Sequence, residues 1–257
     1  MRLLLPTLGA VLVLAGCAGE AGPAGPALQG TAANLDEIES GVLSVSVRMA
    51  PKDGEEFGYD IRGPVELAGD GKFPLADVKY TQIAGGRDDT VRLVLEEDGS
   101  GWIERAGKRT DLTESQLSEL RSSGSLLGAG GLRTLGFEKW IVDPKLSDGP
   151  NDTDKVTADL DVAAAMAGLS ALSGALKQDV VLTAKQRKEV ADAVDDSSFE
   201  LLTGKEDRLL RKLALDFSLG ADVPADLRDA IGDDVVGARF SFDLGLDKVN
   251  EPVRIGD

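Results

Sequence analysis

The sequence predicts an α+β protein built on a broad, curved antiparallel β-sheet with helices across one face. Three observations lead to this fold class. Apolar side chains occupy every second position in the first and last thirds of the chain, as at 43–49 and 240–246, which is the period of a strand with one apolar face. The middle third changes to a helical period. One of its helical segments, 163–177, is unusually rich in alanine and glycine, so it offers small side chains to cover the sheet.

The first third predicts a short helix and then a meander of strands. Asn34 is a suitable N-cap for a helix at 35–41. Asp98-Gly99-Ser100 and Gly107-Lys108-Arg109 are turn sequences on either side of the run 101–105, which predicts hairpins there. The strands predicted in this third are 43–49, 57–61, 65–67, 78–80, 91–95 and 101–105.

The middle third predicts helices with marked beginnings. Thr113 with Gln116, and Thr183 with Gln186, have the spacing of a capping box, which begins a helix. The other elements predicted from 126 onwards are a mobile glycine-rich flap at 126–136, a strand at 137–142 that Asp143-Pro144 stops, a strand at 156–162, a helix at 163–177, a strand at 213–219, a short helix from Pro224 and a strand at 240–246.

Cys17 closes the run Leu14-Ala15-Gly16-Cys17 directly after a short apolar stretch with Arg2 at its start. The apolar stretch is too short to cross a bilayer, and the small residues before Cys17 suit a signal peptidase. The run resembles the bacterial lipobox, and this resemblance implies cleavage before Cys17 and acylation of its sulfur and of the new amino terminus. Two or three acyl chains hold a protein on a membrane, whereas one binds marginally. An ordinary secretory signal with a chance cysteine is the alternative.

The chain is predicted to have three parts: a lipoprotein signal peptide at 1–16, a flexible tether at 17–33 and a single domain at 34–257. Glycine, proline and alanine dominate the tether, and such a composition buries too little side chain to offset the entropy of ordering. We therefore expect an exported protein, held by its lipid anchor on the extracytoplasmic side of the cell membrane.

Composition argues against several classes of function. A formal net charge of −17 argues against nucleic acid as a partner. Histidine is absent and the single cysteine is assigned to lipid, which removes Ser-His-Asp and Cys-His catalysis as well as histidine and thiolate metal sites. We therefore expect no enzymatic activity, no cofactor and no metal.

Acidic residues leave two further possibilities open. The run 148–154 has oxygen ligands, but its spacing departs from that of a calcium loop, so a polar turn is the preferred interpretation. The pairs Glu96-Glu97 and Asp233-Asp234 permit a carboxylate-dependent hydrolase, although nothing in the sequence gives one acid a raised pKa beside an ionised partner.

The helices predicted to cover the sheet have small side chains, which fill little volume. The segment 163–174 consists largely of alanine, glycine and serine, and aromatic residues make up only 4% of the chain. Because empty apolar space costs dispersion contacts, a wide sheet under such a cover favours a cavity that an acyl chain would fill. Small-residue helices also pack closely on sheets, so a filled core is the alternative.

Several segments follow one another in a characteristic order: the lipobox, the tether, the strand ending at Met49-Ala50, and 101–105, 139–144, 155–162 and 240–244. This order resembles that of the actinobacterial LppX/LprAFG lipoproteins. That family has a LolA-like fold, a half-barrel of the LolA/LolB kind with helices across its mouth, and it holds lipid acyl chains. The resemblance implies the same fold and ligand class here, while the stretch 185–196 departs from the family and leaves the ligand open.

We therefore expect a membrane-anchored lipoprotein that binds and carries lipids or glycolipids in a hydrophobic cavity. An envelope sensor acting through a protein partner and a structural lipoprotein with a filled core are the alternatives. Lys139, Arg133 or Lys177 are the candidates to meet a lipid head group. The side chains expected to line the cavity are Val45, Val47, Met49, Phe57, Tyr59, Ile61, Val91, Leu93, Leu95, Leu126, Leu127, Ala164, Ala167, Leu213, Leu215, Phe217, Phe240, Phe242 and Leu244.

Overall fold

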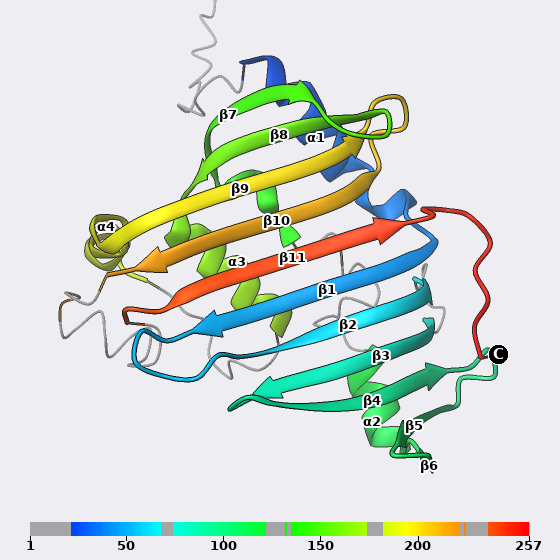
Figure 1. Cartoon of the computed structure of the whole chain (residues 1–257). Coiled ribbons are helices and arrows are strands. Elements are labelled where there is room, and N and C mark those ends of the chain that lie inside the picture. Colours follow the sequence, from blue (N-terminus) through cyan, green and yellow to red (C-terminus); the bar gives the residue numbers. More distant parts are fainter. Residues whose placement is uncertain are drawn as a thin grey trace, which may run out of the picture.

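The computed structural model describes residues 22–67, 74–121, 132, 135–173, 182–220, 224 and 236–256. Within these ranges eleven strands form one antiparallel sheet in the order β6-β5-β4-β3-β2-β1-β11-β10-β9-β8-β7 (Figure 1). The strands are β1 (Ser40–Ala50), β2 (Phe57–Glu66), β3 (Leu75–Ala84), β4 (Arg87–Leu95), β5 (Gly101–Arg105), β6 (Lys108–Asp111), β7 (Ile141–Asp148), β8 (Thr153–Leu160), β9 (Val194–Gly204), β10 (Leu210–Leu219) and β11 (Arg239–Asp247).

The helices lie on one side of this open, curved sheet and at its ends. Helix α3 crosses behind the central strands, and α2 lies behind β4 (Figure 1). This arrangement confirms the α+β class and the antiparallel curved sheet with helices over one face. The helices are α1 (Gly25–Ala33), α2 (Glu114–Arg121), α3 (Val162–Ser173) and α4 (Ala184–Ala193), with 3-10 helices η1 (Gly22–Ala24), η2 (Leu35–Glu37) and η4 (Phe137–Lys139).

Topology places the helices on the concave face. Strands β6 and β7 follow one another in the strand sequence, yet they form the two opposite edges of the sheet. Ten strand spacings of about 4.8 Å separate them, so the chain between β6 and β7 must travel roughly 48 Å across the sheet. Helices α2 and η4 lie on this crossing. The connection between β6 and β7 is therefore also part of the cover.

The strand register aligns apolar side chains in rows across the concave face. Directly paired residues of neighbouring antiparallel strands lie on the same face. One such row crosses nine strands. It consists of Leu146, Val156, Leu201, Leu213, Leu244, Val45, Ile61, Tyr80 and Val91.

The convex face carries charged side chains that pair across the strands. The ammonium of Lys212 lies 3.1 Å from Glu200 and 3.4 Å from Asp243, and Lys155 also pairs with Glu200. Arg92 donates to Asp77 at 2.7 Å. The convex face is therefore polar and exposed to solvent, as the alternation of apolar and polar residues along the strands predicts.

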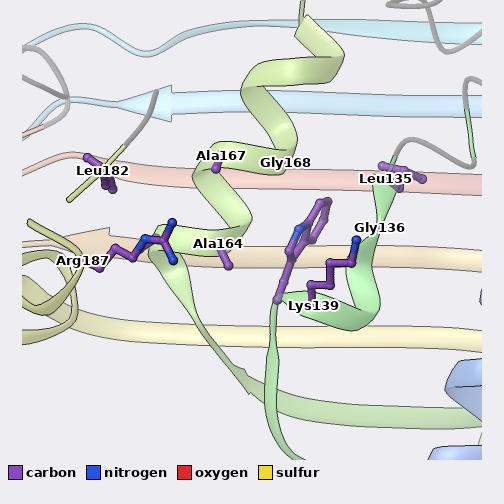
Figure 2. Close-up of a pocket in the computed structure, with 10 residues that line it drawn as sticks. Leu135, Gly136, Lys139, Ala164, Ala167, Gly168, Leu182 and Arg187 are labelled. Atoms are coloured by element: carbon purple, nitrogen blue, oxygen red, sulfur yellow. The ribbon is translucent and has the colours of Figure 1, made fainter. Parts of the chain in front are cut away.

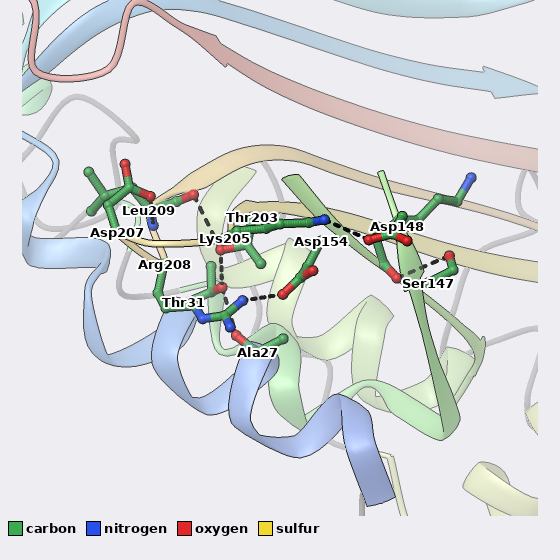
Figure 3. Close-up of polar contacts among 11 residues, drawn as sticks. Ala27, Thr31, Ser147, Asp148, Asp154, Thr203, Lys205, Asp207, Arg208 and Leu209 are labelled. Atoms are coloured by element: carbon green, nitrogen blue, oxygen red, sulfur yellow. Dashed lines mark hydrogen bonds and ion pairs between the residues drawn. The ribbon is translucent and has the colours of Figure 1, made fainter. Parts of the chain in front are cut away.

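The prediction of a flexible tether over 17–33 is wrong for residues 25–33, which form helix α1. Leu28 is 3% exposed and Ala27 2% exposed, so the helix is part of the core. The Thr31 hydroxyl donates to the Thr203 hydroxyl (2.7 Å), which donates to the Leu209 carbonyl (3.3 Å) (Figure 3). A segment of small residues gains its stability from such docking, which composition alone does not reveal.

The strand predicted at 137–142 begins only at Ile141. Gly136 has a φ of 54°, and the turn it makes leads into η4, where Phe137 is fully buried. Asp143-Pro144 does not stop the strand, since β7 continues to Asp148 across a register shift. Proline is tolerated here because β7 is an edge strand and its missing N–H costs no ladder hydrogen bond.

Both predicted capping boxes are confirmed. The Thr113 amide donates to the Gln116 side chain at 2.9 Å at the start of α2, and Thr183 with Gln186 makes both capping contacts at the start of α4. The described part of the predicted helix at 163–177 is α3. Predictions on 1–21 (signal peptide, Cys17 and the first part of the tether), on 126–131 and 133–134 of the flap, on 174–177 of that helix, and on the helix beyond Pro224 lie outside the described residues.

We expect Leu28→Ala to lower the free energy of unfolding by about 2–5 kcal/mol, because it removes a buried side chain from the core. Urea unfolding measures this change. Gln29→Ala, on the exposed side of the same helix, is the control and should change stability by less than about 0.5 kcal/mol. Equal stability of the Leu28→Ala variant and the natural chain would mean that α1 behaves as a tether after all.

Candidate functional site

The concave face of the sheet contains every strand residue predicted to line a cavity. Val45 pairs with both Ile61 and Leu244, and Val47 pairs with Tyr59 and Phe242. The same register places the remaining predicted strand residues on this face. They are Met49, Phe57, Val91, Leu93, Leu95, Leu213, Leu215, Phe217 and Phe240.

Burial divides this face into two parts. Leu213 and Leu244 are 0% exposed, and they belong to the core beneath α3 and η4. The ring of Phe137 from η4 lies 6.4 Å from that of Phe199, between centroids. The predicted lining residues that are buried in the core are Val45, Leu95, Leu213, Leu215, Phe217, Phe242 and Leu244.

The other part of the concave face lies over β1 to β4 with one residue of β11, and its side chains are only half-buried. Phe57, at its rim, is 39% exposed. These eight residues form the apolar strip, the name we use for this surface below. The strip consists of Val47, Met49, Phe57, Tyr59, Ile61, Val91, Leu93 and Phe240.

Two tyrosines stack on the apolar strip. The rings of Tyr59 and Tyr80 lie 5.8 Å apart at an angle of 24°. Burial raises the pKa of the Tyr59 phenol, and Tyr80 adds to the rise. Tyr80 was missed as a lining residue, although it lies in a predicted strand with the right alternation.

A pocket of about 310 Å³ opens on the helical side of the molecule (Figure 2). This volume is at the lower end of the range for ligand sites. Of the residues predicted to line a cavity, Ala164 and Ala167 lie here, away from the strands. The pocket is lined by Leu135, Gly136, Lys139, Trp140, Ala163, Ala164, Ala167, Gly168, Leu182 and Arg187.

Lys139 is the one predicted head-group residue within the described chain, and it does line this pocket. Arg187 was missed. A helical signal for it exists, because Arg187 lies three residues before the buried Val190 on α4 and so near its inward face. Leu126, Leu127, Arg133 and Lys177 lie outside the described residues.

Carboxylates do not gather into a metal site in the described ranges, where three or more potential ligands never cluster. The acidic run 148–154 forms the β7–β8 hairpin turn, with Asn151 and Asp152 at φ 49° and 57°. Asp148 pairs with Lys205 and Asp154 with Arg208 (Figure 3). The polar-turn interpretation is thus confirmed.

Glu96 has an environment unlike that of a general acid. The Trp102 indole donates to it at 3.0 Å and the Ser100 hydroxyl at 2.9 Å. These hydrogen bonds lower the pKa of Glu96, whereas a general acid at neutral pH needs a raised pKa.

Comparisons with known proteins do not assign this chain to a family. No protein-family model matches the chain, and no curated protein matches it. A crystal structure of LolA superfamily protein NE2245 from Nitrosomonas europaea is similar at 14% identity and a TM-score of 0.24, over 86% of this chain and 94% of that chain. None of the helices within the described ranges has both the length and the apolar character needed to cross a bilayer. The fold described above therefore rests on this chain's own strand register.

We expect the stability of the protein to fall with rising pH through the ionisation of Tyr59. The pKa of Tyr59 is raised in the folded state above its ordinary value of 10.0. Its contribution is therefore complete below about pH 10 and is lost as the pH rises through the folded-state pKa. Urea unfolding at a series of alkaline pH values measures the fall.

Lysines titrate in the same range, so the control is Tyr59→Phe, which should lose less stability than the natural chain over that interval. Since Tyr59 and Tyr80 are the only two tyrosines, phenolate absorbance of the Tyr80→Phe variant reports Tyr59 alone. A Tyr59 titration at the ordinary value in that variant would contradict burial of the phenol.

Proposed function

We propose that this protein binds the hydrocarbon part of a lipid or glycolipid on the apolar strip, carries it, and performs no covalent chemistry on it. The observation that supports this proposal is the contrast across one continuous face. On β10, Leu213, Leu215 and Phe217 are all buried. On β1 to β4 only one end of the strands is sealed, as at Val45, Val78 and Leu95. The other end keeps exposed apolar surface, as at Val47, Tyr59 and Val91. Each methylene group that a ligand buries there contributes about 0.8 kcal/mol.

The chemistry of the strip favours a hydrocarbon over a polar ligand. Its side chains are aliphatic or aromatic, and the charged residues that alternate with them along β1 and β2 lie on the convex face. Polar side chains share the face of the strip at Gln82 and Asp89, on β3 and β4. An apolar ligand needs no matching hydrogen bonds there, whereas a polar one would lose its own to water. The strip therefore suits lipids with different head groups.

We expect Val47→Trp to reduce the lipid that co-purifies with the protein, because Val47 is half-buried at the centre of the strip. Solvent extraction followed by mass spectrometry measures the lipid per protein chain. Ser46→Trp is the matched control, since it is one residue away on the same strand and so on the opposite face. It should leave bound lipid unchanged.

Unfolding measurements on the same pair separate a ligand site from a filled core. If Val47 were packed in a closed core, the larger side chain would cost about 1–3 kcal/mol of stability. A clean natural chain without lipid, together with marked destabilisation of Val47→Trp, would support a structural lipoprotein in place of a carrier.

We also propose that Cys17 is acylated and holds the protein on the extracytoplasmic side of the cell membrane. The supporting observation is the position of η1. η1 packs against the edge strand β7, and five residues from Cys17 to Gly22 span at most about 18 Å. Val142 and Leu146, 46% and 39% exposed, lie on that same strand. The anchor would thus hold the β7 edge close to the lipid.

We expect Cys17→Ser to move the protein from the membrane fraction to the soluble fraction, because no acyl chain can then attach. Mass spectrometry of the N-terminal peptide from the natural chain should find acylated Cys17. A natural chain in the soluble fraction with a free thiol would contradict the anchor and would leave the proposal for the apolar strip standing.

A further inference from the structure

The pocket beside α3 has walls that are fixed in place. The Asp161 amide donates to the Trp140 carbonyl at 2.7 Å, which joins the end of η4 to the start of α3. A Cβ on Gly168 would lie only 2.5 Å from the Trp140 ring, so the indole packs directly against the helix backbone. Trp140 is 2% exposed and makes a rigid apolar wall. A preorganised wall lowers the cost of binding.

Two cations reach this pocket from different elements. Lys139 comes from η4 and Arg187 from α4, and both line the pocket. In Figure 2 the Arg187 side chain extends toward α3, and the Lys139 side chain lies on the other side of the Trp140 indole, next to Gly136. No acidic residue is among the lining residues. Two nearby acids have partners of their own: the Asp161 carboxylate accepts from the Ala164 amide at 3.0 Å, and one oxygen of Glu189 pairs with Lys185 at 3.0 Å.

Neither of these two cations is held by a carboxylate of the described chain. Across the sheet, arginines and lysines pair with carboxylates, as Arg92 does with Asp77 and Arg239 with Asp216. The side chains of Lys139 and Arg187 form no hydrogen bond or ion pair with any residue in the described ranges. In a protein with a net charge of −17, a small basic pocket is complementary to an anion.

We propose that this pocket binds the phosphate group of a lipid, held between Lys139 and Arg187, with the start of its chain against Trp140 and Ala164. The guanidinium supplies a planar pair of donors and the ammonium a compact charge, a combination suited to a phosphate. This inference rests on the proposed lipid-binding function and adds a preference for an anionic head group to it.

The test is calorimetric titration of the full chain, freed of bound lipid, with two probes that share one acyl chain. 1-Oleoyl lysophosphatidate carries a phosphate, and monooleoylglycerol has none. We expect the natural chain to bind the lysophosphatidate about tenfold more tightly or better, since charge-assisted hydrogen bonds are the stronger kind. In Lys139→Gln/Arg187→Gln the two probes should bind nearly equally.

The matched control is Lys185→Gln/Lys188→Gln, which removes the same amount of charge from α4. These lysines pair with Glu189 and Asp192 and do not line the pocket. The control should keep the preference, and an equal loss in both double variants would overturn the site. Trp140 reports location, because Trp102→Phe leaves it as the single tryptophan. Its fluorescence should change with lysophosphatidate, and an unchanged signal during binding would overturn the location.

The remaining outcomes separate this inference from the function on which it rests. Equal binding of both probes to the natural chain would overturn the head-group site and leave the lipid-binding proposal intact. Binding of neither probe would overturn both. Inorganic phosphate that binds as tightly as lysophosphatidate, with no binding of monooleoylglycerol, would identify a site for the free anion and overturn the lipid assignment.

Discussion

An open sheet of eleven strands has an apolar face that has to be kept from water, and the rest of this structure follows from how that face is covered. The rows of paired residues are continuous from β7 to β4, so the sheet itself does not limit how far the apolar face extends. The limit comes from the cover. Phe137, Trp140 and the alanines of α3 belong to the core that seals β8 to β10. On β1 to β4 that core covers one end of the strands, and the other end of the same face is only half-buried.

The helices over the sheet also differ from its convex face in how their charged side chains are paired. On the convex face, opposite charges on neighbouring strands pair with each other, which leaves that surface wetted and electrostatically satisfied. Beside α3, Lys139 and Arg187 line a pocket with alanine, glycine and tryptophan, and neither has such a partner among the described residues. Helix α3 is apolar on both sides, so it can pack on the sheet with one side and line a pocket with the other.

The N-terminal helix connects these features to the proposed anchor. α1 is joined to the turn between β9 and β10, where Asn34 donates to the Asp207 carbonyl at 2.9 Å and Arg208 packs over Gly30. A lipid on Cys17 would therefore be attached only a few residues before α1, a helix that is packed against the sheet. The distance between the anchor and the sheet would be short. The β7 edge and its exposed apolar side chains would then face the membrane, which restricts the orientations open to a carrier.

The sequence by itself determined the strands, their apolar face and the capped helices. Two local patterns predicted these elements correctly: the alternation at 43–49 and 240–246, and the spacing of Thr113 with Gln116. They could do so because each depends only on residues that are close along the chain. Tertiary structure alone decided that 25–33 is a docked helix, that Phe137 leaves its expected strand to fill the core, and that Leu213 and Leu244 are sealed while Val47 and Tyr59 are not. It also brought Arg187 to the pocket of Lys139. Each of these depends on which distant segment packs over a residue. A periodic pattern predicts the face of the sheet on which a side chain lies, and it does not predict which segment packs on that face.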